Sequence, residues 1–345
     1  MPTRPSILFA YLRPPDAMPS YVTRDLAILE EIAEVEWIRS YPGRAWRRHL
    51  GPGGWLPGRE MLRRIAASDL VFQWFATPSA PAVGARLMRK PAIVVSGGFD
   101  VASVPELDYG RMVHPLTRNM SRLALRAATR VLAVSRFNAS EVERWAPRAR
   151  LEVLPHGFEP MPRPRSARER RVVSVGTISW EYMLRKGLED VARVSTRMPE
   201  VEFILAGKHV HPDAAEHLRG IGGPNLRLPG FLPDAELDDL LGSSAVYLQL
   251  SRHEAFGCSV AEAMLAGSTP VLTRDGALPE VGGDAAYYVG SRDPDHVAEV
   301  VRSALDDNRA DRSHDRISAE YPVESRRRRL HALVAELLRQ PGVPS

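Results

Sequence analysis

Short apolar segments alternate with amphipathic helical patterns along this chain, in two successive blocks separated by a proline-rich break. The break reads Pro-Met-Pro-Arg-Pro-Arg at residues 160–165 and continues as a charged run to Arg171. Proline lacks the N–H that helices and central strands need, and the charged run offers little to bury, so this stretch predicts a linker. Apolar strands separated by helices indicate a parallel sheet covered on both faces. The pattern therefore predicts two doubly wound α/β domains.

Each block contains the strand candidates that such a sheet requires. In the first block they are residues 6–12, 36–39, 70–75, 92–96, 130–134 and 151–154. In the second block they are residues 172–175, 201–206, 225–228, 245–250, 270–273 and 286–289. Helical patterns include residues 118–128, 139–145, 186–197, 234–241, 259–266 and 294–305. Sheets of this kind bind ligands at the carboxyl ends of their strands, and two facing sheets create one cleft.

The expected domain organisation follows from these blocks. We expect an N-terminal Rossmann-like domain over residues 1–160, a linker over 161–171, a second Rossmann-like domain over 172–320 and a final helix over 321–345. The apolar face of that helix consists of Leu330, Leu333, Val334, Leu337 and Leu338. We expect the arginine run 326–329 to lie on the solvated face of this helix. Whether the helix crosses back to the N-terminal domain stays open.

Composition excludes several other classes of protein. Of the 345 residues, 44% are hydrophobic and 26% charged, which is ordinary for a globular protein and excludes disorder. No segment approaches the ~18 consecutive apolar residues of a membrane span, and residues 1–10 lack the pattern of a secretory signal. A single cysteine, Cys258, excludes a disulfide framework. We therefore expect a cytoplasmic protein, in which Asn138-Ala139-Ser140 starts a helix instead of accepting a glycan.

The charge balance says little about macromolecular partners. A net charge of +4 is weak evidence for nucleic acid, since binding domains usually carry a basic stripe or an aromatic platform, and we expect no nucleic-acid partner. Residues 44–55 are basic and tryptophan-bearing, with Arg59, Arg63 and Arg64 following. This stretch leaves two interpretations open, a weak peripheral contact with anionic lipid and an ordinary basic loop and helix.

Residues 245–272 form the most informative segment, which predicts a strand, a short loop, a helix and a second strand. Gly257 relieves crowding where the chain turns into the helix, Ser259 can cap the helix, and Gly267 suits a left-handed ending. The amides around residues 258–260 would then point into the crevice at the positive end of the helix dipole. Such a helix start is an anion site suited to a diphosphate.

Two carboxylates flank this predicted anion site. Glu254 lies in the loop and Glu262 near the start of the helix. A carboxylate accepts two hydroxyl hydrogen bonds, so the pair can grip two sugar rings on either side of a phosphate. The residues from Ser259 to Glu262 also fit the S-x-x-E capping box, in which Glu262 returns to the backbone. Both interpretations of Glu262 stay open.

The segment 253–264, His-Glu-Ala-Phe-Gly-Cys-Ser-Val-Ala-Glu-Ala-Met, resembles the E-x7-E signature of the GT4 family of retaining, nucleotide-sugar-dependent glycosyltransferases. Further similarity lies at residues 172–176, 185–187, 203–207, 229–232 and 279–284, and it is thinner in the first half. The resemblance implies the GT-B architecture, an α/β fold of two facing Rossmann-like domains with a deep interdomain cleft. It also implies transfer of a sugar from a nucleoside diphosphate to an acceptor.

The resemblance assigns roles to particular residues. Glu254 would hold donor-sugar hydroxyls beside the anomeric carbon, and Lys186, helped by Arg185, would neutralise the diphosphate leaving group. Glu262 would bind the ribose of the nucleotide. The other donor-binding residues implied are Phe231 and Leu232 beside the base, and Phe256, Gly257, Cys258 and Ser259 at the sugar and phosphates.

This chain departs from the family pattern in three places. Gly176-Thr177 lacks the arginine that many relatives carry, so either Arg185 or another basic residue takes its role, or phosphate binding is weaker. Residues 14–19 replace a glycine-rich loop, which leaves the acceptor unassigned. Residues 97–100, Gly-Gly-Phe-Asp, stand where relatives often place a histidine facing the sugar. Gly98 and Asp100 are therefore candidate sugar or acceptor contacts, with a simple turn as the alternative.

We expect neither a metal nor a cofactor. The D-x-D at residues 293–295 has the sequence of a helix N-cap followed by proline, and Lys186 supplies positive charge without a cation. A UDP- or GDP-sugar would be the substrate, and the acceptor, a small molecule, a glycan or a lipid-linked molecule, stays open. The alternatives are a nucleotide-sugar epimerase or sugar phosphorylase on the same fold, and a non-catalytic anion-binding module.

Overall fold

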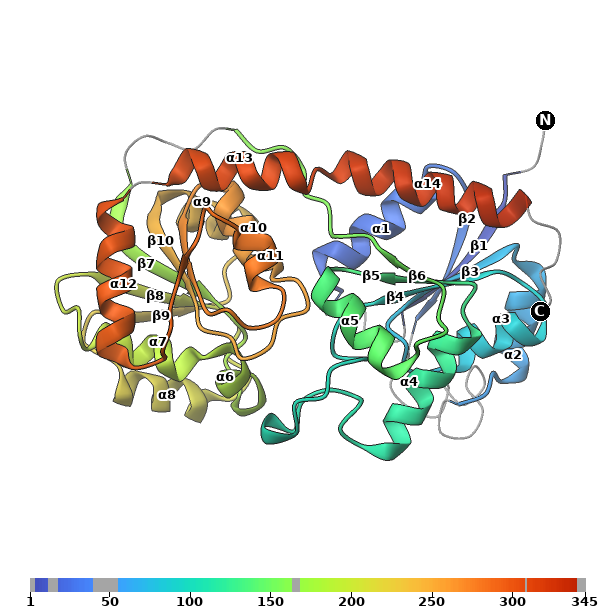
Figure 1. Cartoon of the computed structure of the whole chain (residues 1–345), viewed down its shortest axis with the longest axis horizontal. Coiled ribbons are helices and arrows are strands. Elements are labelled where there is room, and N and C mark those ends of the chain that lie inside the picture. Colours follow the sequence, from blue (N-terminus) through green and yellow to red (C-terminus); the bar gives the residue numbers. More distant parts are fainter. Residues whose placement is uncertain (1–3, 12–17, 40–54, 163–167, 308, 340–345) are drawn as a thin grey trace. The chain divides into compact units, whose positions relative to one another are not determined.

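A computed structural model describes residues 4–11, 18–39, 55–162, 168–307 and 309–339 (Figure 1). The chain divides into two compact units, and each is described by itself. The first unit comprises Met1–Gly157 together with Val323–Ser345, and the second comprises Phe158–Pro322. Each unit contains a six-stranded sheet in which all strand pairs are parallel. The expected pair of doubly wound α/β domains is confirmed.

The sheet of the first unit has the strand order β2-β1-β3-β4-β5-β6. Its strands are β1 (Ser6–Tyr11), β2 (Glu34–Arg39), β3 (Leu70–Trp74), β4 (Ala92–Ser96), β5 (Arg130–Ala133) and β6 (Leu151–Val153). Every residue of β3 and β4 is buried, because helices cover both faces of the sheet (Figure 1). This burial explains why these strands are apolar runs without a polar alternation.

The helices of the first unit begin close to their expected positions. They are α1 (Ser20–Glu30), α2 (Arg59–Ala67), α3 (Ala80–Leu87), a short 3-10 helix η4 (Pro105–Leu107), α4 (Pro115–Ala127), α5 (Arg136–Trp145) and α14 (Val323–Arg339). The prediction that Asn138 starts a helix is wrong by a few residues. The side chain of Ser135 caps α5 by accepting a hydrogen bond from the amide of Asn138, which lies buried inside the first turn.

The C-terminal helix α14 belongs to the first unit, where it packs along α1. Leu330, Leu333, Val334 and Leu337 are buried, as their helical spacing predicts. The expectation that the whole arginine run is solvated is wrong for Arg326, which is buried against Asp25. Its guanidinium donates to both carboxylate oxygens, each at 2.6 Å. Residues far apart in the sequence therefore share one core.

The sheet of the second unit has the strand order β12-β11-β10-β7-β8-β9. Its strands are β7 (Glu169–Val175), β8 (Glu202–Ala206), β9 (Leu226–Gly230), β10 (Ser244–Gln249), β11 (Thr269–Leu272) and β12 (Tyr287–Tyr288). The predicted end of the linker, residue 171, is wrong, because β7 already starts at Glu169. Arg171 lies opposite Glu202 in the ladder and donates to it at 2.6 Å, so these charged residues are paired within the sheet.

The helices of the second unit are α6 (Trp180–Lys186), α7 (Leu188–Ser195), α8 (Pro212–Ile221), α9 (Asp234–Ser243), α10 (Cys258–Leu265), α11 (Leu278–Gly282), α12 (Pro294–Asp306) and α13 (Ala310–Glu320). The helix expected over residues 186–197 is confirmed as the slightly shorter α7, and the prediction missed α6, which ends just before Gly187. Gly187 has φ 65°, and a Cβ there would lie 2.1 Å from the carbonyl oxygen of Leu250. The close approach to β10 therefore ends α6 and starts α7 in a new direction.

Candidate active site

The strand order of the second unit reverses between β7 and β10, and this reversal marks where a ligand site is expected. β7 pairs with β8 on one side and with β10 on the other. In open parallel sheets ligands bind outside the carboxyl ends of the strands at such a switch point. The loop after β10 carries Glu254, and the loop and helix after β7 carry Arg185 and Lys186. The fold thus brings three predicted site residues to one edge.

The helix α10 starts one residue earlier than expected and without a side-chain cap. Gly257 occupies the N-cap position with φ 99°, a conformation that L-residues rarely adopt. Ser259 therefore lies inside the helix, and the predictions that it caps α10 or closes a capping box with Glu262 are wrong. Its hydroxyl lies 3.5 Å from Oε1 of Gln249 instead. Gly267 does take the expected left-handed conformation, with φ 91°.

The start of α10 offers fewer amides to a ligand than expected. The amides of Val260 and Ala261 both donate to the carbonyl of Gly257, at 3.0 and 3.1 Å. The prediction that the Val260 amide faces the crevice is therefore wrong. The first-turn positions Cys258 and Ser259 lie where helix amides have no intrahelical acceptor. They are half-buried, as is Glu262.

Glu254 is a buried carboxylate that is held by several donors. Its Oε1 accepts hydrogen bonds from Lys186 Nζ at 2.6 Å, Gln249 Nε2 at 2.9 Å and Ser251 Oγ at 3.0 Å. Arg185 Nη1 lies 3.6 Å from the same oxygen. Within the described part of the chain, no residue donates a hydrogen bond to the other oxygen, Oε2. The side chain of Glu254 is 10% exposed. Glu254 therefore presents one oxygen that can accept a hydrogen bond from a ligand.

The charge state of Glu254 follows from its neighbours. Burial alone would raise the pKa of this carboxyl, because it disfavours the charged form. The positive charges of Lys186 and Arg185, with the hydrogen bonds from Lys186 and Ser251, outweigh burial and lower the pKa from 4.5 to about 2. The carboxylate is therefore ionised at neutral pH.

Lys186 and Arg185 reach Glu254 from the end of α6. Gly187 ends that helix against the carbonyl of Leu250, at the end of β10, so its two basic residues stand beside the Glu254 loop. Arg185 Nη1 also donates to the carbonyl of His253 at 3.2 Å. Side-chain exposure is 9% for Arg185 and 17% for Lys186. Two cations with little access to water therefore border one carboxylate.

Three further predicted residues surround this edge. Phe231 directly follows β9 and is 71% exposed, and Leu232 is half-buried. The ring of Phe256 is buried and packs against Phe158 and Tyr321, with ring centroids 6.1 and 5.3 Å away. The side chain of Phe256 thus packs inside the second unit. The expected contact of Phe256 with the donor would be made by its backbone amide, and it stays a prediction.

Gly98 and Asp100 lie in the first unit, after β4. Asp100 is fully buried, and its two oxygens accept hydrogen bonds from the amides of Ala76 at 2.8 Å and Gly97 at 3.1 Å. Burial raises the pKa of Asp100 to about 6, against the lowering effect of these backbone hydrogen bonds. Asp100 therefore joins the loops after β3 and β4, and its candidate contact with a sugar or acceptor stays a prediction. Gly98 has φ 105° in the same turn.

The structure adds polar residues that the sequence interpretation missed. Gln249 is buried at the end of β10, where its Oε1 accepts from Tyr247 at 2.8 Å while its Nε2 donates to Ser251 and Glu254. Burial raises the pKa of Tyr247, so its hydroxyl stays a donor. The available signal was the polar Gln249 and Ser251 at the end of an otherwise apolar strand.

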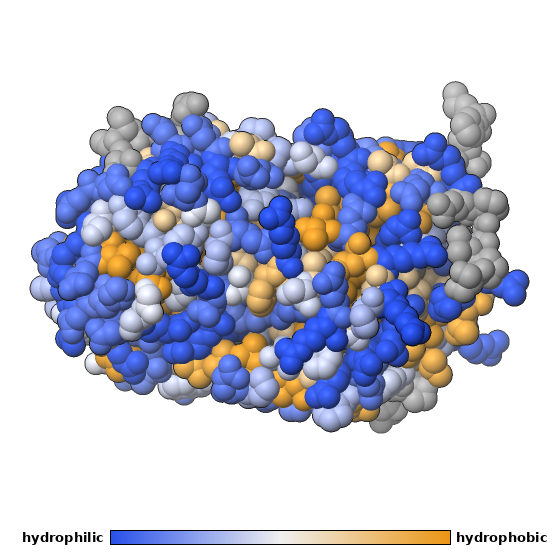
Figure 2. All heavy atoms as spheres, in the orientation of Figure 1, coloured by the Kyte–Doolittle hydropathy of each residue, from blue (hydrophilic) through white to orange (hydrophobic). Residues whose placement is uncertain are grey.

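The expected metal and membrane features can be compared with the described part of the chain. Within it, no group of three or more His, Cys, Asp or Glu residues could hold a metal ion. Asp293 of the D-x-D caps α12 by accepting from the amides of Asp295 and His296, as predicted. No described helix has the length and apolar character needed to cross a bilayer. Residues 44–54, and residues 14–17 of the replaced glycine-rich loop, lie outside the described residues. On the face that Figure 2 shows, hydrophilic residues are interspersed with several apolar areas.

Comparison with known proteins identifies the second unit. Residues 160–321 match the glycosyl transferases group 1 family. The second unit therefore belongs to that family, and with it the chain carries a glycosyltransferase domain.

Individual relatives support this assignment. The 2-deoxystreptamine glucosyltransferase of Streptomyces kanamyceticus is 27% identical over 276 residues, which cover 71% of this chain and 70% of the relative. The O-antigen chain mannosyltransferase B of Escherichia coli is 33% identical over 84 residues, 24% of this chain. That match spans only 22% of the Escherichia coli protein.

The whole described fold also has solved counterparts. Anabaena HepE, crystallised with UDP and glucose, superposes with a TM-score of 0.77 at 16% sequence identity, covering 96% of this chain and 100% of HepE. At this identity the likeness concerns the fold. Together with the two six-stranded sheets it confirms the expected GT-B class.

Proposed function

We propose that this chain is a retaining glycosyltransferase of the GT4 type, which moves a sugar from a nucleoside-diphosphate sugar to an acceptor without a metal ion. The observation that carries the proposal is the Glu254–Lys186 pair, at 2.6 Å, beside the start of α10 in a glycosyl transferases group 1 domain. The donor is a UDP- or GDP-sugar.

Lys186 is the proposed electrophilic group of the reaction. Breaking the anomeric bond leaves negative charge on the departing diphosphate, and a fixed cation with little access to water stabilises that charge. Arg185 lies on the same edge and adds to the positive potential. The amides of Cys258 and Ser259, at the positive end of α10, are proposed to meet the phosphates. These groups together make a divalent cation unnecessary.

Glu254 is proposed to hold and stabilise the donor sugar. A carboxylate with a pKa of about 2 carries no proton at neutral pH, so it cannot act as a general acid on the leaving group. Its Oε2 can accept a sugar hydroxyl, and its charge stabilises the oxocarbenium-like centre that develops nearby. Retention then follows front-face attack, in which the donor phosphate takes the acceptor proton. This role differs from the two carboxyl groups of a glycosidase, which flank one bond.

The remaining residues are proposed to bind the nucleotide. Glu262 follows the first turn of α10, where a half-buried carboxylate can accept the ribose hydroxyls. Phe231 and Leu232 after β9 border the base, and the exposed ring of Phe231 provides an apolar face for it. The acceptor is left as a small molecule, a glycan or a lipid-linked molecule.

A nucleotide screen followed by donor hydrolysis tests the proposal. Thermal shifts with UDP, GDP and ADP select the nucleotide, and slow hydrolysis of matching sugar donors reveals the sugar without the acceptor. We expect Glu254→Gln to lower donor hydrolysis by about 100-fold or more, since it removes a charge at the reacting centre. Glu236→Gln, at an exposed position of α9, is the control with unchanged hydrolysis.

Three outcomes would contradict the proposal. Full activity of Glu254→Gln would remove the assigned role of Glu254. Stabilisation by a nucleotide with no turnover of any donor would indicate a binding module. Dependence on free phosphate, or isotope exchange into an epimerised donor, would indicate a phosphorylase or an epimerase.

A further inference from the structure

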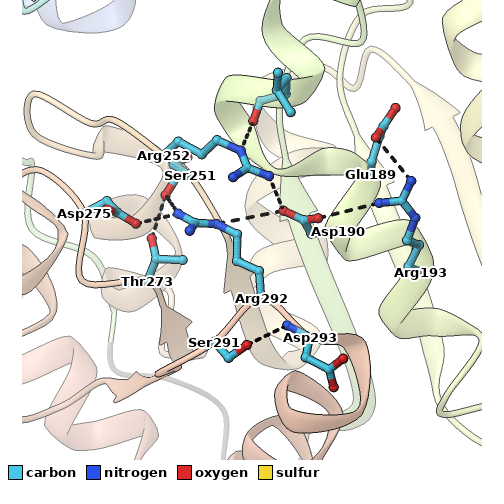
Figure 3. A network of polar contacts seen from close by, with 11 residues as sticks. Glu189, Asp190, Arg193, Ser251, Arg252, Thr273, Asp275, Ser291, Arg292 and Asp293 are labelled. Carbon is cyan, nitrogen blue, oxygen red and sulfur yellow. Dashed lines mark hydrogen bonds and ion pairs between the residues drawn. The ribbon is translucent and has the colours of Figure 1, made fainter. Parts of the chain in front are cut away.

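A buried carboxylate outside the proposed donor site, Asp190 of α7, lies at the centre of a network of arginines (Figure 3). Asp190 Oδ2 accepts from Arg252 Nη2 at 3.3 Å and lies 3.9 Å from Arg292 Nε. Its Oδ1 lies 3.9 Å from Arg193 Nη1. We call Asp190, Arg252 and Arg292 the Asp190 cluster. Its arginines come from the loop after β10 and the segment before α12, so one carboxylate links three parts of the second unit.

Arg252 links the Asp190 cluster to the end of α6. Its Nε donates to the carbonyl of Leu184 at 3.1 Å, and its backbone amide donates to the carbonyl of Arg185 at 2.7 Å. These carbonyls directly precede Lys186 in the chain. The position of Arg252 therefore helps to set where the proposed leaving-group lysine stands.

Arg292 links the Asp190 cluster to the loop that carries Glu254. Its Nη2 donates to the carbonyl of Ser251 at 3.2 Å and to Asp275 at 2.5 Å (Figure 3). Thr273 Oγ1 donates to the same Ser251 carbonyl at 2.7 Å. The hydroxyl of Ser251 donates in turn to Glu254 Oε1 at 3.0 Å. A chain of polar contacts thus runs from Asp190 through Arg292 and Ser251 to Glu254.

The charge balance explains why Asp190 is needed at this place. Arg252 and Arg292 both face Asp190 Oδ2, at 3.3 and 3.9 Å, and like charges that share a partly buried site repel. Asp190 lies between the two arginines and compensates them. Without its charge, Arg252 gains by turning toward water, which weakens its contact with the Leu184 carbonyl, while Arg292 keeps Asp275 as a carboxylate partner but loses the second one.

We propose that Asp190 is a positioning residue for glycosyl transfer. It holds Arg252 and Arg292, and these arginines keep Glu254 and Lys186 in their positions relative to each other. This inference rests on the proposed function and adds to it a residue that acts through others. Displacement of a catalytic group by about 1 Å can cost about 100-fold in rate. The Asp190 cluster is placed to prevent such a displacement.

The kinetic test compares Asp190→Asn with Glu189→Gln, its neighbour on α7. Glu189 contacts Arg193 and His217 instead of the Glu254 loop, so its variant is the matched control. We expect Asp190→Asn to lower kcat for donor hydrolysis about 10- to 100-fold, while the Kd for the free nucleoside diphosphate, which also contacts Lys186, rises by a clearly smaller factor. Unchanged kcat in a folded Asp190→Asn protein would overturn the inference, as would equal losses in kcat and nucleotide affinity.

A second measurement does not depend on activity. Urea midpoints of Asp190→Asn, Glu254→Gln and the double variant form a cycle, in which coupled sites give non-additive shifts. We expect non-additivity for this pair and additivity for Glu189→Gln with Glu254→Gln. Additive shifts for both pairs would overturn the coupling to Glu254 even if no donor is ever turned over. If Asp190→Asn does not fold, Arg292→Lys replaces it, because lysine cannot hold Ser251 and Asp275 in the same planar geometry.

Discussion

At the scale of single residues, the chemistry depends on how Glu254 keeps its charge while it is buried. An unpaired buried carboxylate would take up a proton, because the protein interior solvates charge poorly. Lys186 and Arg185 prevent this by facing the same oxygen, and Ser251 and Gln249 add neutral donors. The arrangement leaves the other oxygen for a ligand. The same groups that prepare the site therefore also stabilise the fold.

This coupling predicts a pH dependence of stability. The folded-state pKa of Glu254 is lowered from 4.5 to about 2, so its contribution is present above about pH 4.5 and is lost as the pH falls toward 2. The contribution is at most about 3 kcal/mol, from about 1.36 kcal/mol for each pKa unit. Urea unfolding at pH 6 and pH 3 should show a smaller loss for Glu254→Gln than for the wild type. The Glu236→Gln control should lose as much stability between pH 6 and pH 3 as the wild type. If Glu254→Gln also loses that much, the assigned pKa is contradicted.

At the scale of elements, the break between α6 and α7 places the cations. Lys186 ends α6 only because Gly187 adopts a left-handed conformation against the end of β10. A continuous helix through this point would carry Lys186 in another direction. The short helix α6 is therefore part of the site geometry.

Gly187→Ala tests this element directly. An added Cβ would lie 2.1 Å from the Leu250 carbonyl oxygen at φ 65°, so we expect a loss of at least about 1–3 kcal/mol in unfolding free energy and weaker nucleotide binding. Gly220→Ala, in α8 with nothing within 4 Å of its added Cβ, should instead gain about 0.5–1 kcal/mol. Chemical denaturation of both variants measures the difference. Similar effects at both positions would show that the contact with Leu250 does not shape α6.

The strands were predictable from the sequence, because each is a local apolar run covered on both faces. The division at Gly187 was not, because its cause is a contact with Leu250, which is distant in sequence. Ser259 looked like a cap because local rules allow it, whereas the tertiary turn at Gly257 already starts α10. Local patterns therefore predict elements better than the breaks between them.

The candidate site was predictable only in part. Glu254 came from the pattern of residues 245–272, Lys186 and Arg185 came from a resemblance, and their meeting needs the fold. Gln249 is marked only by its polarity at the end of an apolar strand, and Asp190 carries no local signal that separates a site residue from an ordinary polar residue. Their roles appear only when strands and loops from different parts of the chain lie together.

At the scale of the whole molecule, the C-terminal helix α14 belongs to the first unit, although most of that unit comes from the N-terminal part of the chain. Arg326 of α14 and Asp25 of α1 have side-chain exposures of 2% and 0%. Arg326 also donates to the carbonyls of Leu154 and Pro155, at 2.7 and 2.9 Å. One guanidinium thus ties the two sequence-distant pieces of the first unit together.

Removal of the Arg326 guanidinium should lower the free energy of unfolding strongly. Arg326→Met leaves the Asp25 charge buried without its partner, and we expect a loss of about 3–5 kcal/mol in unfolding free energy. The double variant Asp25→Leu with Arg326→Met should recover most of it. Arg327→Met, which removes exposed ion pairs with Glu31 and Glu324, should cost about 1 kcal/mol or less. Equal costs for the two single variants in urea unfolding would contradict the role given to Arg326.

A crystal structure with the nucleoside diphosphate that stabilises the chain most tests the central claim directly. We expect diphosphate density at the first turn of α10, with Lys186 Nζ within hydrogen-bonding distance of a phosphate oxygen and the ribose at Glu262. Nucleotide density at another place, with Lys186 still bound only to Glu254, would contradict the claim.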